Sequence, residues 1–129
     1  MEIPNDLRYT LEHEWIRTEE NKGIIGITAF AQDQLGDIVF VDLPSVGTQV
    51  VKEETFGVVE SVKTVSDLYA PVSGTVVAIN KSLEATPELI NSEPFKDGWL
   101  IEIEVSDQEE IDKLLTPDQY SEQCEKESE

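Results

Sequence analysis

Short segments in which apolar and polar residues alternate make up most of the chain, from about residue 9 to residue 105. They are rich in β-branched and aromatic residues, and turn residues interrupt them at intervals of about ten residues, which is typical of short strands. The predicted strands cover residues 14–18, 24–28, 37–43, 48–51, 55–61, 64–69, 75–80 and 99–105. Segments such as 44–47 and 71–74 combine a Pro with a Gly and therefore fit turns. The pattern predicts a mainly β chain.

Helical patterns occur in one internal segment and at the C-terminal end. Residues 28–35 predict a short helix, in which Thr28 is the N-cap and Gly36 ends the helix. Two capping-box patterns, Ser106–Glu109 and Thr116–Gln119, each predict the start of a further helix. The buried faces of these helices would be formed by Ile111, Leu114, Leu115, Tyr120 and Cys124. We expect these helices over about 107–125, with a frayed tail from Glu125 onward.

One hairpin in the middle of the chain presents a lysine. The strands 55–61 and 64–69 are separated by Val62 and Lys63, so Lys63 is expected at or near the tip. Two hairpin-like halves that face each other would form a flattened barrel-sandwich hybrid of short antiparallel strands. A chain of 129 residues can bury a core as one domain. We therefore expect a single domain, 1–129, with a β core over about 7–105.

Charge and composition exclude several classes of function. Nine Lys and Arg against 28 Asp and Glu give a net charge of −19, which repels nucleic acid and anionic membranes. No apolar run approaches the roughly 20 residues that span a bilayer. Cys124 is the only Cys, so an intramolecular disulfide is impossible and a reducing compartment is expected. We expect a cytoplasmic location in a bacterium, or a mitochondrial one if this is a processed eukaryotic chain.

The chain offers little for catalysis. Its only His is His13, and a nucleophilic pair of His13 with Cys124 would require the two ends of the domain to meet. His13 with its neighbouring carboxylates provides at most a weak, open metal site. A lysine in an exposed tight turn, in contrast, is accessible to a modifying enzyme, and its long side chain can carry an attached group. Lys63 therefore favours a carrier over a stand-alone enzyme.

Several segments resemble the H protein of the glycine cleavage system. Around Lys63 these are Glu60–Lys63, Ser66–Tyr69 and Pro71–Gly74. The others are Tyr9–Trp15, Gly26–Thr28, Phe30–Gln32, Leu35–Asp37, Val39–Pro44, Leu89–Asn91 and Gly98–Leu100. The resemblance extends from about residue 9 to residue 103 and departs in few positions, such as Thr64 where Ala is frequent.

The resemblance implies a lipoyl-carrier fold and a non-catalytic role in glycine catabolism and one-carbon metabolism. Lys63 matches the lysine whose amine is joined to lipoic acid, attached by a lipoate ligase or lipoyltransferase. The implied partners are a pyridoxal-phosphate glycine decarboxylase, an aminomethyltransferase that uses tetrahydrofolate, and dihydrolipoamide dehydrogenase. The arm would carry the aminomethyl group of glycine between the first two and deliver electrons to the third.

Two carboxylates are candidates for holding the carried group. The aminomethyl group ends in a cationic amine, and a carboxylate accepts charge-assisted hydrogen bonds from such a group. Glu14 and Asp67 both lie in matching segments. The alternative is structural: Glu14 would pair with Arg17, and Asp67 would cap a turn.

Three other functions remain open. A related carrier with the same fold relays lipoyl groups to other lipoate-dependent enzymes, and the sequence does not separate it from the first role. A biotin carrier has a similar architecture, but its lysine usually lies between methionines, whereas Met1 is the only Met here. An unmodified interaction module would lack any adduct at Lys63.

Overall fold

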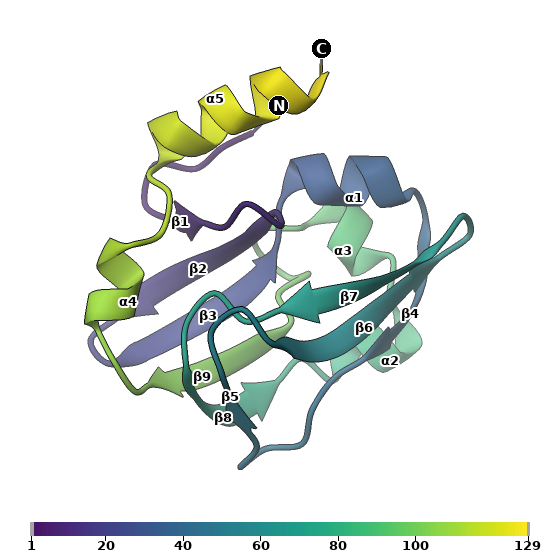
Figure 1. Ribbon diagram of the computed structural model, residues 1–129. Coiled ribbons are helices and arrows are strands. Elements are labelled where there is room, and N and C mark those ends of the chain that lie inside the picture. Colours follow the sequence, from purple (N-terminus) through teal and green to yellow (C-terminus); the bar gives the residue numbers. More distant parts are fainter. Residues whose placement is uncertain (1, 129) are drawn as a thin grey trace.

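The computed structural model describes residues 2–128, whose strands form two antiparallel sheets (Figure 1). The larger sheet has the order β1 (Arg8–Tyr9), β2 (Glu14–Glu19), β3 (Lys22–Ile27), β9 (Ile101–Val105), β8 (Gly74–Ile79) and β5 (Gln49–Val50). The smaller sheet consists of β4 (Ile38–Asp42), β6 (Thr55–Ser61) and β7 (Val65–Tyr69). All eight predicted strands are present, and the mainly β prediction is confirmed. Within residues 2–128 the strands form two sheets and do not close into a barrel.

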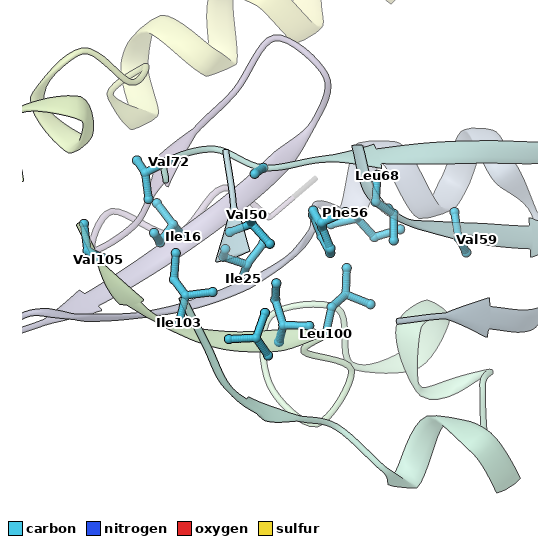
Figure 2. Close-up of a cluster of buried hydrophobic side chains, with 14 of the residues drawn as sticks. Ile16, Ile25, Val50, Phe56, Val59, Leu68, Val72, Leu100, Ile103 and Val105 are labelled. Atoms are coloured by element: carbon cyan, nitrogen blue, oxygen red, sulfur yellow. The ribbon is translucent and has the colours of Figure 1, made fainter. Parts of the chain in front are cut away.

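The main core lies between the two sheets, and Figure 2 shows its side chains. Phe56, Val59 and Leu68 project from β6 and β7 toward the larger sheet, where Ile25 and Ile103 are fully buried. Because neighbouring residues of a strand point to opposite faces, the alternate residues of β6 and β7 face outward. The smaller sheet therefore has one buried face and one face open to solvent.

The internal helix α1 (Ala29–Leu35) begins and ends as predicted. The Thr28 Oγ1 accepts a hydrogen bond from the Ala31 N–H at 3.2 Å, which satisfies one unpaired donor of the first turn. Gly36 follows the last turn with φ 81°, a conformation that favours glycine. This helix lies beside the tip of the β6–β7 hairpin (Figure 1).

Two short helices, α2 (Ser82–Ala85) and α3 (Leu89–Ser92), were not predicted. Each is four residues long, and neither N-cap residue makes a side-chain hydrogen bond to the helix. A single turn shows too little of the helical period to be recognised in a sequence. Burial of Leu83 and Ile90 in the core stabilises these turns instead.

The C-terminal helices differ from the prediction in two respects. Helix α4 (Glu109–Asp112) does not use Ser106 as a cap, because the Ser106 N–H pairs with Ser73 O and extends the sheet. The carboxylate of Asp107 instead accepts from the Glu109 N–H at 3.0 Å. Helix α5 (Pro117–Ser128) continues through Glu125 to Ser128, so the prediction of a frayed tail is wrong.

The second capping box is confirmed. The Gln119 N–H donates to Thr116 Oγ1 at 3.2 Å, and the Thr116 N–H donates to Gln119 Oε1 at 2.9 Å. Helix α5 then lies over β1, as Figure 1 shows, and Tyr120 and Cys124 are buried as predicted. None of the helices within residues 2–128 is long and apolar enough to cross a lipid bilayer.

Candidate functional site

Lys63 lies in the three-residue loop at the tip of the β6–β7 hairpin, where the sequence predicted it. The Ser61 Oγ accepts hydrogen bonds from the N–H groups of Lys63 and Thr64, at 3.2 and 3.1 Å. The Ser61 N–H also donates to Thr64 O at 2.8 Å. These bonds fix the backbone of a loop whose side chains, from Val62 to Val65, are exposed.

The side chain of Lys63 does not extend straight into solvent from the exposed loop. It lies back across the end of α1, and its Nζ donates to Gln34 O at 3.3 Å. Gly36 makes room for this path, because a Cβ there would lie 2.9 Å from Lys63 Cε. Within residues 2–128, no carboxylate lies within ion-pair distance of Lys63 Nζ. The amine is therefore held by one weak contact and stays accessible.

Glu14 is a buried carboxyl at the start of β2, with 2% of its surface exposed. The hydroxyl of Thr10 donates to its Oε1 at 2.6 Å, and the Tyr69 N–H donates to its Oε2 at 3.2 Å. Burial raises the pKa of Glu14 to about 7 despite these two hydrogen bonds. Glu14 is thus poised between its neutral and charged forms near neutral pH.

The alternative pairing of Glu14 with Arg17 does not occur. Residues three apart on a strand point to opposite faces, so the two side chains diverge. Arg17 Nη2 instead donates to Phe95 O at 2.9 Å, and its Nε lies 3.9 Å from Asp6.

A cavity of about 390 Å³ opens beside Glu14. Its apolar walls come from β1, the end of β7 and the segment before α5, and they include Tyr9, Leu11, Tyr69, Pro71, Leu114 and Leu115. Its charged lining consists of Glu12, Glu14, Lys52, Glu53 and Lys113. The cavity combines these apolar walls with three carboxylates and two lysines, and Glu14 is the buried carboxyl among them, so it can hold a small ligand with a cationic end.

Asp67 lies between Lys63 and this cavity. Val65, Asp67 and Tyr69 share the outward face of β7, because Leu68 between them is buried on the other face. Asp67 is exposed, and within residues 2–128 its carboxylate accepts no hydrogen bond, so it does not cap a turn. Asp67 does not line the cavity itself, but its neighbour Tyr69 does. Lys63 and Asp67 therefore lie along β7 and the loop before it, and β7 ends at the cavity that Glu14 of β2 lines.

Sequence reasoning missed Thr10 and Tyr69. The Thr10 Oγ1 accepts from the N–H groups of Glu12 and Glu14, a local pattern that is typical of Thr before a turn and was readable in principle. Tyr69 contributes its backbone N–H to Glu14, and no sequence signal reports a backbone contact between segments that far apart.

The two ends of the chain do meet, but they form no nucleophilic pair. His13 Nδ1 lies 2.8 Å from the Tyr120 hydroxyl, and Cys124 is buried one helical turn beyond Tyr120. Burial raises the pKa of the Cys124 thiol, whereas an activated nucleophile needs a lowered pKa.

Comparison with known proteins gives one family. The family model of the glycine cleavage H-protein matches residues 7–127. Glycine cleavage system H proteins of Bacillus cereus and Bacillus anthracis are 57% identical to the chain over 122 residues, which is 95% of this chain and 96% of theirs. The crystal structure of a glycine cleavage system H protein from Mycobacterium marinum superposes with a TM-score of 0.86 at 39% identity. It covers 98% of this chain and 100% of its own.

These matches confirm the expected role of a non-catalytic carrier in the glycine cleavage system. They extend the sequence resemblance beyond residue 103, because the family model also includes α4 and nearly all of α5. The chain belongs to the glycine cleavage H-protein family.

Proposed function

We propose that this chain carries lipoic acid in amide linkage to Nζ of Lys63 and so moves the aminomethyl group of glycine between enzymes. The position of Lys63 carries the proposal: its side chain is exposed, its amine makes no ion pair with any residue from 2 to 128, and a loop with a fixed backbone presents it. A modifying enzyme needs that access. When bound, the lipoyl group supplies a reactive disulfide at the end of a long arm.

The outward face of β7 supports a path for the arm. From the loop, Val65 offers an apolar surface, Asp67 a carboxylate, and Tyr69 a wall of the cavity beside Glu14. The buried side chains of Val59 and Leu68 pack the smaller sheet against the core, which should keep it rigid. The scaffold therefore holds Lys63 and the cavity at a constant separation while only the side-chain arm moves.

Glu14 is proposed to receive the cationic amine of the aminomethyl cargo. Its carboxylate is fixed by Thr10 and by the Tyr69 N–H, so little reorganisation is needed when the amine arrives. The apolar walls would reduce the access of water to the carbon next to the amine. Asp67, on the path to the cavity, attracts the same positive charge at longer range.

The proposed partners follow from membership of the family. They are glycine decarboxylase, aminomethyltransferase and dihydrolipoamide dehydrogenase, together with a lipoate ligase or lipoyltransferase that attaches the arm. The net charge of −19 supports partners whose docking surfaces are basic. The single thiol, Cys124, and the bacterial relatives support a cytoplasmic location.

Enzymatic attachment tests the lysine. The purified chain is incubated with a lipoate ligase, ATP and lipoic acid, and the adduct is mapped by peptide mass spectrometry. We expect one lipoyl adduct, on Lys63, which Lys63→Arg abolishes and the exposed-lysine control Lys81→Arg does not. An adduct on another lysine, or a biotinyl adduct on Lys63 in native material, would contradict the proposal.

A further inference from the structure

Tyr120 of α5 contacts both ends of the turn that carries Glu14, although it lies outside the cavity lining. Its ring stacks on that of Tyr9 with centroids 4.5 Å apart and planes 6° from parallel. Its hydroxyl lies 2.8 Å from His13 Nδ1 and 2.6 Å from Thr28 Oγ1. Tyr120 is fully buried, so these contacts are shielded from water.

The turn between Tyr9 and Glu14 is held by hydrogen bonds that converge on Thr10. The Thr10 N–H donates to Glu14 O at 3.0 Å, and the His13 N–H donates to Thr10 O at 3.2 Å. The Thr10 hydroxyl both accepts from the Glu14 N–H and donates to the Glu14 carboxylate. A shift of the turn therefore moves the carboxylate with it.

His13 is the weak point of this turn. Its φ of 69° lies in the left-handed region, which costs a residue other than glycine free energy and persists only where neighbouring contacts fix it. The Thr28 N–H donates to His13 O at 3.0 Å, and the His13 ring stacks on Phe30 and bonds to Tyr120. The Tyr120 hydroxyl contacts both His13, which precedes β2, and Thr28, which follows β3, and so links the adjacent ends of these two strands.

We propose that Tyr120 is a positioning residue, which fixes the turn from Tyr9 to Glu14 and thereby holds the Glu14 carboxylate at the cavity. The inference rests on the proposed role of Glu14 toward the amine of the cargo. It assigns helix α5 a part in protecting the cargo, although its residue Tyr120 is not part of the cavity lining.

Tyr120→Phe isolates the hydroxyl, because it keeps the stacking on Tyr9 and removes the bonds to His13 and Thr28. The control is Val76→Ala, which removes a buried side chain from β8 in the core between the sheets. It lowers stability without touching the turn. Circular dichroism shows whether both variants remain folded at the temperature of the measurements.

The first readout is the titration of the Glu14 carboxyl carbon by NMR in the unmodified chain. We expect a midpoint near 7 in the unmutated chain, because the group is buried, and a lower midpoint in Tyr120→Phe, because a looser turn admits water. Glu12, Lys52, Glu53 and Lys113 face the same cavity and are unchanged in every variant. Val76→Ala is expected to leave the midpoint unchanged. An unchanged midpoint in Tyr120→Phe would overturn the inference.

The second readout is the rate at which the lipoylated chain loses its aminomethyl cargo to hydrolysis. We expect Tyr120→Phe to lose it about 3- to 10-fold faster, which is the effect of about one hydrogen bond. In a chain that already carries Glu14→Gln, Tyr120→Phe should not increase the rate of cargo loss further, because both residues act through the Glu14 carboxylate. Additive effects would show that Tyr120 acts elsewhere and would overturn the inference.

The failures of the inference and of the proposed function differ. If Glu14→Gln increases the rate of cargo loss and Tyr120→Phe does not, only the positioning role of Tyr120 is contradicted. If Glu14→Gln has no effect on the rate of cargo loss, the proposed role of Glu14 is contradicted, and the positioning role with it.

Should Tyr120→Phe not fold, His13→Asn replaces it. Asn tolerates the left-handed conformation, but its shorter side chain cannot contact both the Tyr120 hydroxyl and the Glu127 carboxylate, as the His13 ring does. The same lowered midpoint is expected, and an unchanged one overturns the inference.

Discussion

The carboxyl of Glu14 is the residue on which the chemistry of the site depends most directly. It is almost completely buried, yet it faces a cavity large enough for a small ligand. The raised pKa, about 7, means that the Glu14 carboxyl exchanges its proton near neutral pH when no cation lies beside it. A cationic amine favours the charged form, so binding of the amine and loss of the proton from Glu14 are coupled.

Burial of Glu14 predicts a loss of stability as pH rises. Its pKa is higher in the folded state than in the unfolded state, so its full contribution is present below the unfolded value of 4.5 and is lost as pH rises through about 7. The free energy of unfolding should fall by on the order of 3 kcal/mol across this window. Glu14→Gln should lack this decline. Urea unfolding of both chains from about pH 4 to about pH 8 measures it, and parallel profiles would contradict the assignment.

Protection of the cargo should show the opposite dependence on pH. The amine needs the Glu14 carboxylate, so the cargo should be lost faster as pH falls below about 7 in the unmutated chain. Glu14→Gln should lose it roughly tenfold faster at neutral pH, because a charge-assisted hydrogen bond is removed. Asp67→Asn should have a smaller effect, because Asp67 is exposed.

The control for both variants is Asp33→Asn on the exposed side of α1, which should change nothing. The measurement is release of formaldehyde or ammonia from the loaded chain over time. Equal rates of release from the unmutated chain and the three variants would contradict a role of Glu14 and Asp67 in protecting the cargo.

At the residue scale, the sequence led to three candidate side chains but not to their environments. Lys63 was found from its place between two strands, and Glu14 and Asp67 from the resemblance. The burial of Glu14 depends on Thr10 and on a backbone N–H of β7, which lies 55 residues away in the sequence. Such contacts follow from the packing of the sheets and have no local signature.

Among the elements, the end of α1 and the hairpin loop are coupled through Gly36. Gly36 and Gly47 both have positive φ, 81° and 95°, so alanine should lower the free energy of unfolding at either site, by about 1–3 kcal/mol. Only at Gly36 would the new Cβ meet Lys63, at 2.9 Å from Cε, whereas nothing lies within 4 Å of it at Gly47.

Gly36→Ala should therefore displace the side chain of Lys63 and change the rate at which a lipoate ligase modifies it, while Gly47→Ala should not. The rate is measured by mass spectrometry at limiting ligase, and the loss of stability by urea unfolding. Equal modification rates in the two variants would contradict the contact between Gly36 and the lysine side chain.

The elements with complete local signals were predicted well. Helix α1 has both a cap and a terminal glycine, and α5 has a full capping box, so both appear where expected. The box at Ser106 failed because the sheet competed for the backbone of the same residue. Helices α2 and α3 depend on the burial of Leu83 and Ile90, which the pattern of four residues does not reveal.

On the scale of the whole molecule, we expect the net charge of −19 to influence encounters with the proposed partners. We expect the association rate with aminomethyltransferase to fall as ionic strength rises from about 0.05 to about 0.5 M, because salt screens charges over about one Debye length. Stopped-flow or surface plasmon resonance measures the rate. An association rate that is indifferent to salt would exclude steering by the acidic surface.

The arrangement of the two sheets was predicted only as a class. The strand patterns indicate which residues face inward, but not that β9 pairs with β3 on one side and β8 on the other. These pairings join segments distant in sequence and are decided by long-range packing. The expectation that residues 1–129 act as one domain stays a prediction.

The central claim is that Lys63 links this scaffold to the glycine cleavage reaction. The most direct measurement is glycine-dependent formation of NADH by glycine decarboxylase, aminomethyltransferase with tetrahydrofolate, and dihydrolipoamide dehydrogenase, with the lipoylated chain added last. We expect NADH to form only when the lipoylated chain is present and not with Lys63→Arg. A lipoylated chain that donates its lipoyl group to other proteins, yet supports no NADH formation from glycine, would contradict the account and indicate a lipoyl relay.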